Sequence, residues 1–164
     1  MKIKIAILGS TGSIGKSTLD VIRKDKKNFE IILLSANNNY RKLIAQAKEF
    51  NVKNVIIKNS IFYDKIKKSL KNQKTKVYSG DVSISKIVSK KLDYTMAAIV
   101  GIAGLKPTLE AIKISRTVAI ANKESIICGW DVLSKFVKKY KTKIVPIDSE
   151  HFSIMELTKN AKDE

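Results

Sequence analysis

A short glycine-rich turn near the start of the chain constrains the fold more than any other feature. The run GSTGSIG (residues 9–15) follows the apolar segment Ile3–Leu8 and leads into Ser13–Lys24, whose apolar residues recur at helical spacing. In a nucleotide-binding turn the three glycines permit a tight bend, close approach of the backbone to a pyrophosphate, and close packing of helix on strand. Free N–H groups at the start of the helix then attract the anion. The alternative is a plain turn with a glycine cap, and a P-loop is excluded because no Gly-Lys-Ser/Thr ending follows the required four-residue gap.

Strand-like and helix-like segments alternate along the rest of the chain. We expect strands at 3–8, 30–35, 52–57, 76–78, 94–100, 117–121 and 143–147, and helices at 13–24, 40–50, 61–70, 82–90, 105–114 and 124–140. Repeated strand–helix units with short connections predict a mostly parallel sheet covered by helices on both faces. Right-handed crossovers then give a doubly wound, Rossmann-like α/β fold.

The net charge of +17 at first suggests a nucleic-acid partner. However, 29 of the 32 basic residues are lysines, and they are spread along the whole chain. Readers of nucleic acid usually need arginine for bidentate contacts to phosphate and guanine. We therefore expect a solvated lysine surface and no nucleic-acid partner, with a general attraction for small anions as the second interpretation.

Targeting and cysteine chemistry are the next classes that the sequence limits. The run Ile3–Leu8 is too short for a signal-peptide core or a membrane span, so we expect a cytoplasmic protein without a membrane partner. Cys128 is the sole cysteine, which excludes a disulfide scaffold and a cysteine-based zinc site. It falls within a helical pattern and lacks an activating partner, so we expect it to be buried and inert.

The end of the second predicted strand bears on the choice of dinucleotide. NAD-specific sites usually place a carboxylate there to bind the ribose 2′-hydroxyl, but this chain has Asn37, Asn38 and Asn39. A 2′-phosphate would meet no repulsion, and Arg41 or Lys42 is near enough in sequence to reach it. The stretch therefore favours NADP(H), although three asparagines forming a polar turn fit either cofactor.

Two acidic residues follow the last predicted strand. Asp148 and Glu150 stand at positions i and i+2, so in an extended segment they project together beyond the carboxyl edge of the sheet. Paired carboxylates at that edge suit Mg²⁺ or Mn²⁺. An alternative is that Asp148 caps a helix beginning near Ser149. His151 is available for metal binding or proton transfer, but a single histidine is more often structural.

The segment Ala121–Ser125 (ANKES) follows another predicted strand at the same edge. Lys123 is well placed there to contact an anionic group or a developing alkoxide. Glu124 has a structural alternative, because acidic residues are favoured in the first turn of a helix.

Four motifs, in order, resemble one enzyme family. GSTGSIG, MAAIVGIAGLKPTLEAI (96–112), ANKES and PIDSEH (146–151) are similar to the amino-terminal, NADPH-binding part of 1-deoxy-D-xylulose 5-phosphate reductoisomerases, which make isoprenoid precursors in the methylerythritol phosphate pathway. The resemblance runs from about Lys4 to His151. It implies NADPH, a divalent metal (Mg²⁺ or Mn²⁺), and a small phosphorylated sugar as substrate. In this family the metal holds substrate oxygens while the carbon skeleton rearranges to an aldehyde, which NADPH reduces.

The resemblance also implies residue roles. Lys123 and Ser149 match substrate contacts, and Asp148 and Glu150 match metal ligands. The positions that match cofactor contacts are Thr11, Gly12, Ser13, Ile14, Asn37, Asn38, Asn39, Asn122 and Glu124. Where the family commonly has glycine and then a basic residue, this chain has Asn37 and Asn38, so Arg41 or Lys42 would supply the charge for a 2′-phosphate.

Family members continue into a catalytic domain that supplies a third metal carboxylate, phosphate-binding residues and a lid. We therefore expect residues 1–151 to form the NADPH-binding domain and residues 152–164 to be the truncated, polar start of the following region. The chain is expected to be inactive without that domain or a companion chain, and a family-like homodimer fits this interpretation. The alternatives are a non-catalytic dinucleotide-binding module and a semialdehyde-dehydrogenase-like NADP reductase, which needs an activated cysteine on a loop.

Overall fold

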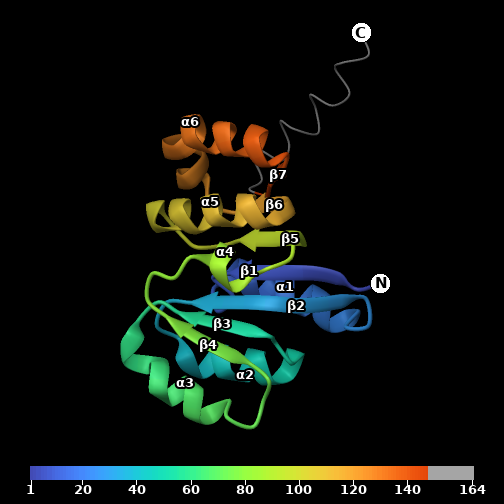
Figure 1. Cartoon of the computed structure of the whole chain (residues 1–164), viewed down its shortest axis with the longest axis vertical. Helices are drawn as coiled ribbons and strands as arrows, with labels where there is room; N and C mark the ends of the chain where they lie inside the picture. The colour runs from blue at the N-terminus through green and yellow to red at the C-terminus, as the bar shows by residue number, and fades with distance from the viewer. Residues whose placement is uncertain (148–164) are drawn as a thin grey trace.

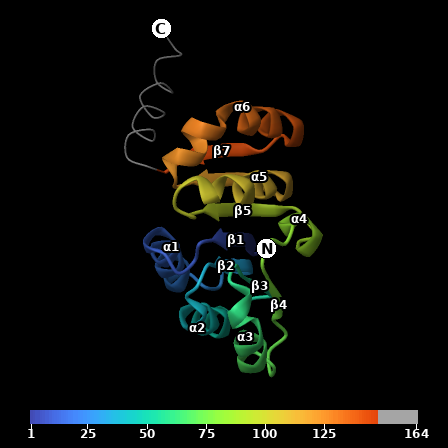
Figure 2. The same ribbon diagram turned by 90° about the vertical axis from the view of Figure 1, so that its left-hand side faces the viewer.

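Seven parallel strands form one sheet in the computed structural model, which describes residues 1–147. Their order across the sheet is β4-β3-β2-β1-β5-β6-β7, and Figure 2 shows them following one another along the long axis. The chain starts at the centre, winds outward to β4, and then returns to β5 on the other side of β1. This topology confirms the predicted doubly wound α/β fold. The strands are β1 (Ile3–Leu8), β2 (Phe29–Ala36), β3 (Asn54–Ile57), β4 (Lys76–Ser79), β5 (Leu92–Ala97), β6 (Ser115–Ile120) and β7 (Lys143–Pro146).

Helices cover both faces of this sheet (Figure 1). Of the helices between residues 1 and 147, three pack on one face and three on the other, through two separate apolar clusters. The first set is α1 (Ser13–Lys24), α2 (Tyr40–Phe50) and α3 (Tyr63–Ser69); the second is α4 (Ile84–Ile87), α5 (Leu105–Ile114) and α6 (Lys123–Tyr140). Two short 3₁₀ turns, η1 (Ser60–Phe62) and η2 (Ile102–Gly104), precede α3 and α5. None of the helices within residues 1–147 combines the length and apolar character needed to cross a bilayer.

The central strand β1 shows why these residues form a doubly covered sheet. Successive side chains of a strand point to opposite faces. Ile5 and Ile7 belong to the cluster under α1, α2 and α3, whereas Ala6 and Leu8 belong to the cluster under α5 and α6. All four are almost fully buried, and burying an isoleucine or leucine side chain contributes about 1.5–3 kcal/mol. A continuous apolar run is therefore required where helices cover both faces.

Two predicted elements end three residues earlier in the structure than expected, whereas the final residues of the others agree to within one residue. The predicted strand 94–100 is β5, which spans Leu92–Ala97; the Ala98 N–H still bonds to the Leu8 carbonyl (2.9 Å), but β1 ends at Leu8 and offers no further partner. Residues 98–100 therefore leave the sheet as a loop. The predicted helix 82–90 shrinks to the single turn α4, because the backbone at Val88 is extended.

The prediction that Cys128 is buried is wrong. Its side chain is exposed on α6. The buried residues of this helix are Ser125, Gly129 and Leu133, which recur every four positions along one stripe. Cys128 lies beside that stripe, so helical periodicity alone does not bury it.

A carboxylate ties the short helix α4 to α5. Glu110 accepts hydrogen bonds from the hydroxyls of Ser83 (2.6 Å) and Ser85 (3.0 Å), and it pairs with Lys113. Burial raises the pKa of Glu110, but the hydrogen bonds from Lys113, Ser83 and Ser85 outweigh burial and lower the pKa to about 2. The ionised form is thus the one that the folded protein stabilises.

This depressed pKa predicts a pH-dependent contribution to stability. Glu110 binds its proton more weakly in the folded chain than in the unfolded chain, so its contribution is present above pH ~4.5 and is lost as the pH falls towards 2. At pH 7, Glu110→Gln should lower the free energy of unfolding by about 1–3 kcal/mol, and the difference from the wild type should shrink below pH 4. Urea unfolding of the wild type and the variant at pH 7 and at pH 3 measures this difference in the free energy of unfolding.

Glu30→Gln is the matched control, because Glu30 forms a surface ion pair with Lys53 (2.6 Å). Such pairs contribute about 0–1 kcal/mol, so this variant should change stability less. A Glu110→Gln deficit of equal size at pH 7 and pH 3 would contradict the role assigned to the carboxylate.

Candidate functional site

The glycine-rich turn is held by backbone hydrogen bonds to the end of β2. The N–H groups of Gly9 and Ser10 both donate to the Ser35 carbonyl, at 3.1 and 2.9 Å, and the Gly9 N–H also contacts the Ser35 hydroxyl at 3.1 Å. The Gly12 N–H donates back to the Gly9 carbonyl at 3.1 Å. These contacts fix the turn at the carboxyl edge of the sheet, which is where ligands bind in folds of this kind.

Two of the glycines are required by the packing of the turn itself. Gly9 has φ of +83°, and a Cβ there would lie 2.7 Å from the Ala98 carbonyl oxygen. A Cβ at Gly15 would lie 2.6 Å from the Ser10 Cα and would clash with the Gly9 carbonyl. At Gly12, in contrast, the described residues place only the Gly9 oxygen near a Cβ, at 3.4 Å. The space beside Gly12 is therefore open, as close approach of a ligand to the backbone requires.

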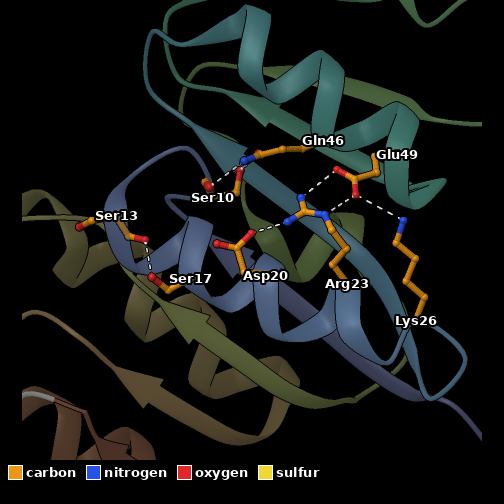
Figure 3. A network of polar contacts seen from close by, with 8 residues as sticks. All are labelled: Ser10, Ser13, Ser17, Asp20, Arg23, Lys26, Gln46 and Glu49. Carbon is orange, nitrogen blue, oxygen red and sulfur yellow. Dashed lines mark hydrogen bonds and ion pairs between the residues drawn. The ribbon is translucent and has the colours of Figure 1, made fainter.

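Side chains of α2 support the turn from behind, as Figure 3 shows. Ser10 is fully buried; its hydroxyl donates to Gln46 Oε1 at 2.8 Å, and Gln46 Nε2 donates to the Ser10 carbonyl at 2.9 Å. Farther along α1 and α2, the Arg23 guanidinium contacts both carboxylate oxygens of Glu49. Gln46 was not among the residues predicted from the sequence, although a polar residue beside Ala47 on the apolar side of α2 is a signal that could have found it.

The amino terminus of α1 is left without a side-chain cap within the described structure. The first N–H groups of a helix, here those of Ser13, Ile14 and Gly15, have no partner within the helix. In α2 and α6, by contrast, a side chain caps the amino terminus. Asn39 accepts a hydrogen bond from Lys42 N (3.2 Å), and Asn122 accepts one from Ser125 N (3.1 Å). α1 thus combines uncapped donors with the positive end of a helix dipole at the turn.

A cleft of about 670 Å³ opens beside this turn, a size typical of small-molecule sites. It lies at the carboxyl ends of β1 to β5 and continues along the loop 98–103. Its lining is largely apolar, with Lys58, Asp81 and Lys106 as the charged residues among those described. The lining residues are Leu8, Gly9, Thr11, Gly12, Ser35, Ala36, Asn37, Ile56, Lys58, Gly80, Asp81, Val82, Ile84, Ala98, Ile99, Val100, Ile102, Ala103, Lys106 and Pro107.

The three asparagines after β2 have different environments. Asn37 lines the cleft. The Asn38 side-chain oxygen accepts a hydrogen bond from Asn59 Nδ2 (3.0 Å), and Asn39 caps α2. Arg41 does not line the cleft, and its Nε donates to the Tyr40 hydroxyl (3.3 Å).

Asn122 organises the opposite wall of the cleft. Its side chain is buried, and its Nδ2 donates to the carbonyls of Ile99 and Gly101, the latter at 3.3 Å. It therefore joins the loop 98–103 to the start of α6. Lys123 is exposed and Glu124 is half-buried in the first turn of α6, and neither contributes to the cleft lining.

The expected metal ligands and their neighbours follow β7 in the sequence. Asp148, Ser149, Glu150 and His151 lie outside the described residues. Within residues 1–147, no group of three or more histidine, cysteine, aspartate or glutamate side chains is arranged to hold a metal ion.

Some of the predicted cofactor contacts do lie together at the cleft. Thr11, Gly12 and Asn37 line it, and Ser13 and Ile14 begin the helix next to it.

Comparisons with known proteins agree with the fold and with the resemblance of the motifs. Residues 5–129 match the sequence profile of 1-deoxy-D-xylulose 5-phosphate reductoisomerase. The reductoisomerase of Pelagibacter ubique is 57% identical over 161 residues, which cover 97% of this chain and 42% of that protein. That of Bacteroides fragilis is 41% identical over 156 residues, covering 94% and 40%.

Solved structures of reductoisomerases are similar in fold to this chain. The Zymomonas mobilis reductoisomerase in complex with NADPH superposes with a TM-score of 0.86 and 38% identity, over 92% of this chain and 40% of that one. A reductoisomerase in complex with NADPH, fosmidomycin and magnesium gives 0.83 and 38%, over 91% and 37%. This chain spans about 40% of the length of the curated relatives that it matches. Because the family profile matches more than half of the chain, this protein belongs to the 1-deoxy-D-xylulose 5-phosphate reductoisomerase family.

Proposed function

We propose that this chain is the NADPH-binding part of an enzyme that converts 1-deoxy-D-xylulose 5-phosphate to 2-C-methyl-D-erythritol 4-phosphate. The observation that carries the proposal is the uncapped amino terminus of α1 beside Gly12, at the mouth of the 670 Å³ cleft. The family assignment and the NADPH complexes of its relatives support the choice of cofactor.

The described residues fit the diphosphate of a dinucleotide. The N–H groups of Ser13 and Ile14 would donate to its oxygens, the Thr11 hydroxyl would add a further donor, and the dipole of α1 would favour the negative charge. Ile14 contributes only its backbone, because its side chain lines a separate apolar pocket with Val21 and Met96. The loop 98–103 would cover the apolar parts of the cofactor and exclude water. When bound, NADPH supplies the hydride.

The remaining assignments of this proposal rest on the sequence motifs. Residues 1–151 form the NADPH-binding domain, with further cofactor contacts from Asn122 and Glu124. Lys123, exposed at the start of α6, would contact the phosphorylated sugar, as would Ser149. Asp148 and Glu150 would bind Mg²⁺ or Mn²⁺ and hold substrate oxygens. A magnesium complex of a relative supports the metal.

This proposal predicts that the 164-residue chain binds NADPH, because the donors and the lining of the cleft lie within residues 8–107. Titration of the protein into NADPH, followed by nicotinamide fluorescence, should give a saturable signal. No saturation at millimolar concentration would contradict the proposal.

Substitutions of Gly12 and Gly15 should have different effects, because Gly12 borders the cleft and Gly15 packs against the backbone of the turn. Gly12→Asp should weaken NADPH binding by about 100-fold or more, because it places a carboxylate against the diphosphate. It should leave the fold intact, since Gly12 has φ of −75° and open space beside it. Gly15→Ala should instead lower the melting temperature, because its Cβ meets the backbone of Gly9 and Ser10.

Circular dichroism and fluorescence titration measure these effects side by side. Gly12→Ala is the matched control for size without charge, and its loss of affinity should be smaller than that of Gly12→Asp. A folded Gly12→Asp variant with wild-type affinity would show that the turn does not hold the cofactor.

A further prediction concerns Asp148, one of the two acidic residues after β7. Asp148→Asn should leave the NADPH dissociation constant of this chain within about two-fold of the wild type, because the proposed role of Asp148 is metal binding. Isothermal titration calorimetry without added metal measures this. A loss of NADPH affinity as large as that of Gly12→Asp would assign Asp148 to the cofactor site instead.

A further inference from the structure

Three neighbouring strands end in a row at the edge of the cleft. β2, β3 and β4 are in parallel register, with Ala36 beside Ile57 and Ile57 beside Ser79. The residues that follow continue this register for one step, because Lys58 N donates to the Ala36 carbonyl (2.9 Å) and Gly80 N donates to the Ile57 carbonyl (3.0 Å). Lys58 therefore lies between the residues that follow β2 and those that follow β4.

The loop after β3 is also bonded to the loop after β2. Asn59 N donates to the Asn37 carbonyl at 3.1 Å, and Asn59 Nδ2 donates to Asn38 Oδ1 at 3.0 Å. Asn37 and Lys58 both line the cleft. The position that reads the adenosine ribose in dinucleotide-binding folds, at the end of the second strand, thus has Lys58 as its neighbour.

Among the described residues, only two cations line the cleft. Lys106 comes from the first turn of α5 and acts on the Asp81 carboxyl, whereas Lys58 precedes Asn59, which is hydrogen-bonded to Asn37. Arg41 and Lys42 are not part of the lining. The Arg41 guanidinium lies over the Tyr40 ring, 5.8 Å from its centroid, and it bonds to the hydroxyl of the same residue.

Lys58 is available to an incoming anion. Its ammonium pairs with Asp81, but both side chains are more than half exposed, at 52% and 65%. Exposed ion pairs of this kind contribute little, so an anion of higher charge can compete for the ammonium. Lys58 lowers the pKa of the Asp81 carboxyl, with a smaller contribution from Lys106, so this pair favours the carboxylate form of Asp81.

We propose that Lys58 recognises the 2′-phosphate of NADPH and thereby sets the preference of this chain for NADPH over NADH. This inference rests on the proposed function and assigns one of its contacts. It replaces the earlier expectation that Arg41 or Lys42 compensates for the uncharged Asn37 and Asn38. The charge that binds the phosphate comes from the loop after β3 instead of the loop after β2.

The test compares the dissociation constants of NADPH and NADH in three variants. Lys58→Gln should weaken NADPH binding by about ten-fold or more, as expected for loss of a hydrogen bond between charged groups, and should change NADH binding less than two-fold. Asp81→Asn should strengthen NADPH binding several-fold, because it removes the competing carboxylate. Arg41→Gln is the matched control, which loses a cation of the neighbouring loop and should leave the NADPH/NADH ratio unchanged.

A second pair of probes isolates the phosphate itself. Adenosine 2′,5′-bisphosphate should bind more weakly to Lys58→Gln than to the wild type, whereas 5′-AMP should bind both equally. Equal losses for NADPH and NADH in Lys58→Gln, or a selective loss in Arg41→Gln, would overturn the assignment. A wild-type chain that binds neither dinucleotide would refute the proposed function itself, whereas one that binds both with a ratio insensitive to Lys58→Gln would refute only this inference.

Discussion

The close contact between the glycine turn and its two neighbouring strands determines the rest of the site. The Ser35 carbonyl of β2 accepts two N–H groups of the turn, and the Ala98 backbone, just beyond β5, packs against Gly9. This arrangement holds the start of α1 at the centre of the sheet, where the strand order reverses between β1 and β5. A side chain at Gly9 would force the turn away from Ala98 just beyond β5, and one at Gly15 would force α1 away from the turn. The cleft and the exposed donors of α1 are therefore consequences of backbone packing.

Polar side chains behind the cleft have a supporting role that motif positions alone do not reveal. Gln46 holds the Ser10 backbone, and Asn122 holds the loop that contains Ile99 and Gly101. Both are buried residues that satisfy backbone groups, which would otherwise be costly to bury. The two walls of the cleft are thus each fixed by an amide side chain, while the surface of the cleft between them is largely apolar.

The sequence predicted the elements well where local pattern decides and less well where tertiary contacts decide. Apolar runs identified the strands because both faces of the sheet are covered, and helical spacing identified α1, α2 and α6. The end of β5 was not predictable from its own residues, because it depends on where β1 stops at Leu8. Asn38 and Asn39 match family positions in the sequence, but the fold engages them in a hydrogen bond and a helix cap. Lys58 is one of 29 lysines in the sequence, and only strand register places it beside Asn37.

We propose that the uncapped N–H groups of α1 hold the diphosphate of the cofactor. Nuclear magnetic resonance tests this proposal by following the backbone amide signals of the ¹⁵N-labelled chain as NADPH is added. The amide signals of Ser13, Ile14 and Gly15 should move together and saturate with a single dissociation constant, while those at the far end of α1, near Lys24, should stay in place. Saturable binding that leaves these three amides unchanged would show that the diphosphate binds elsewhere.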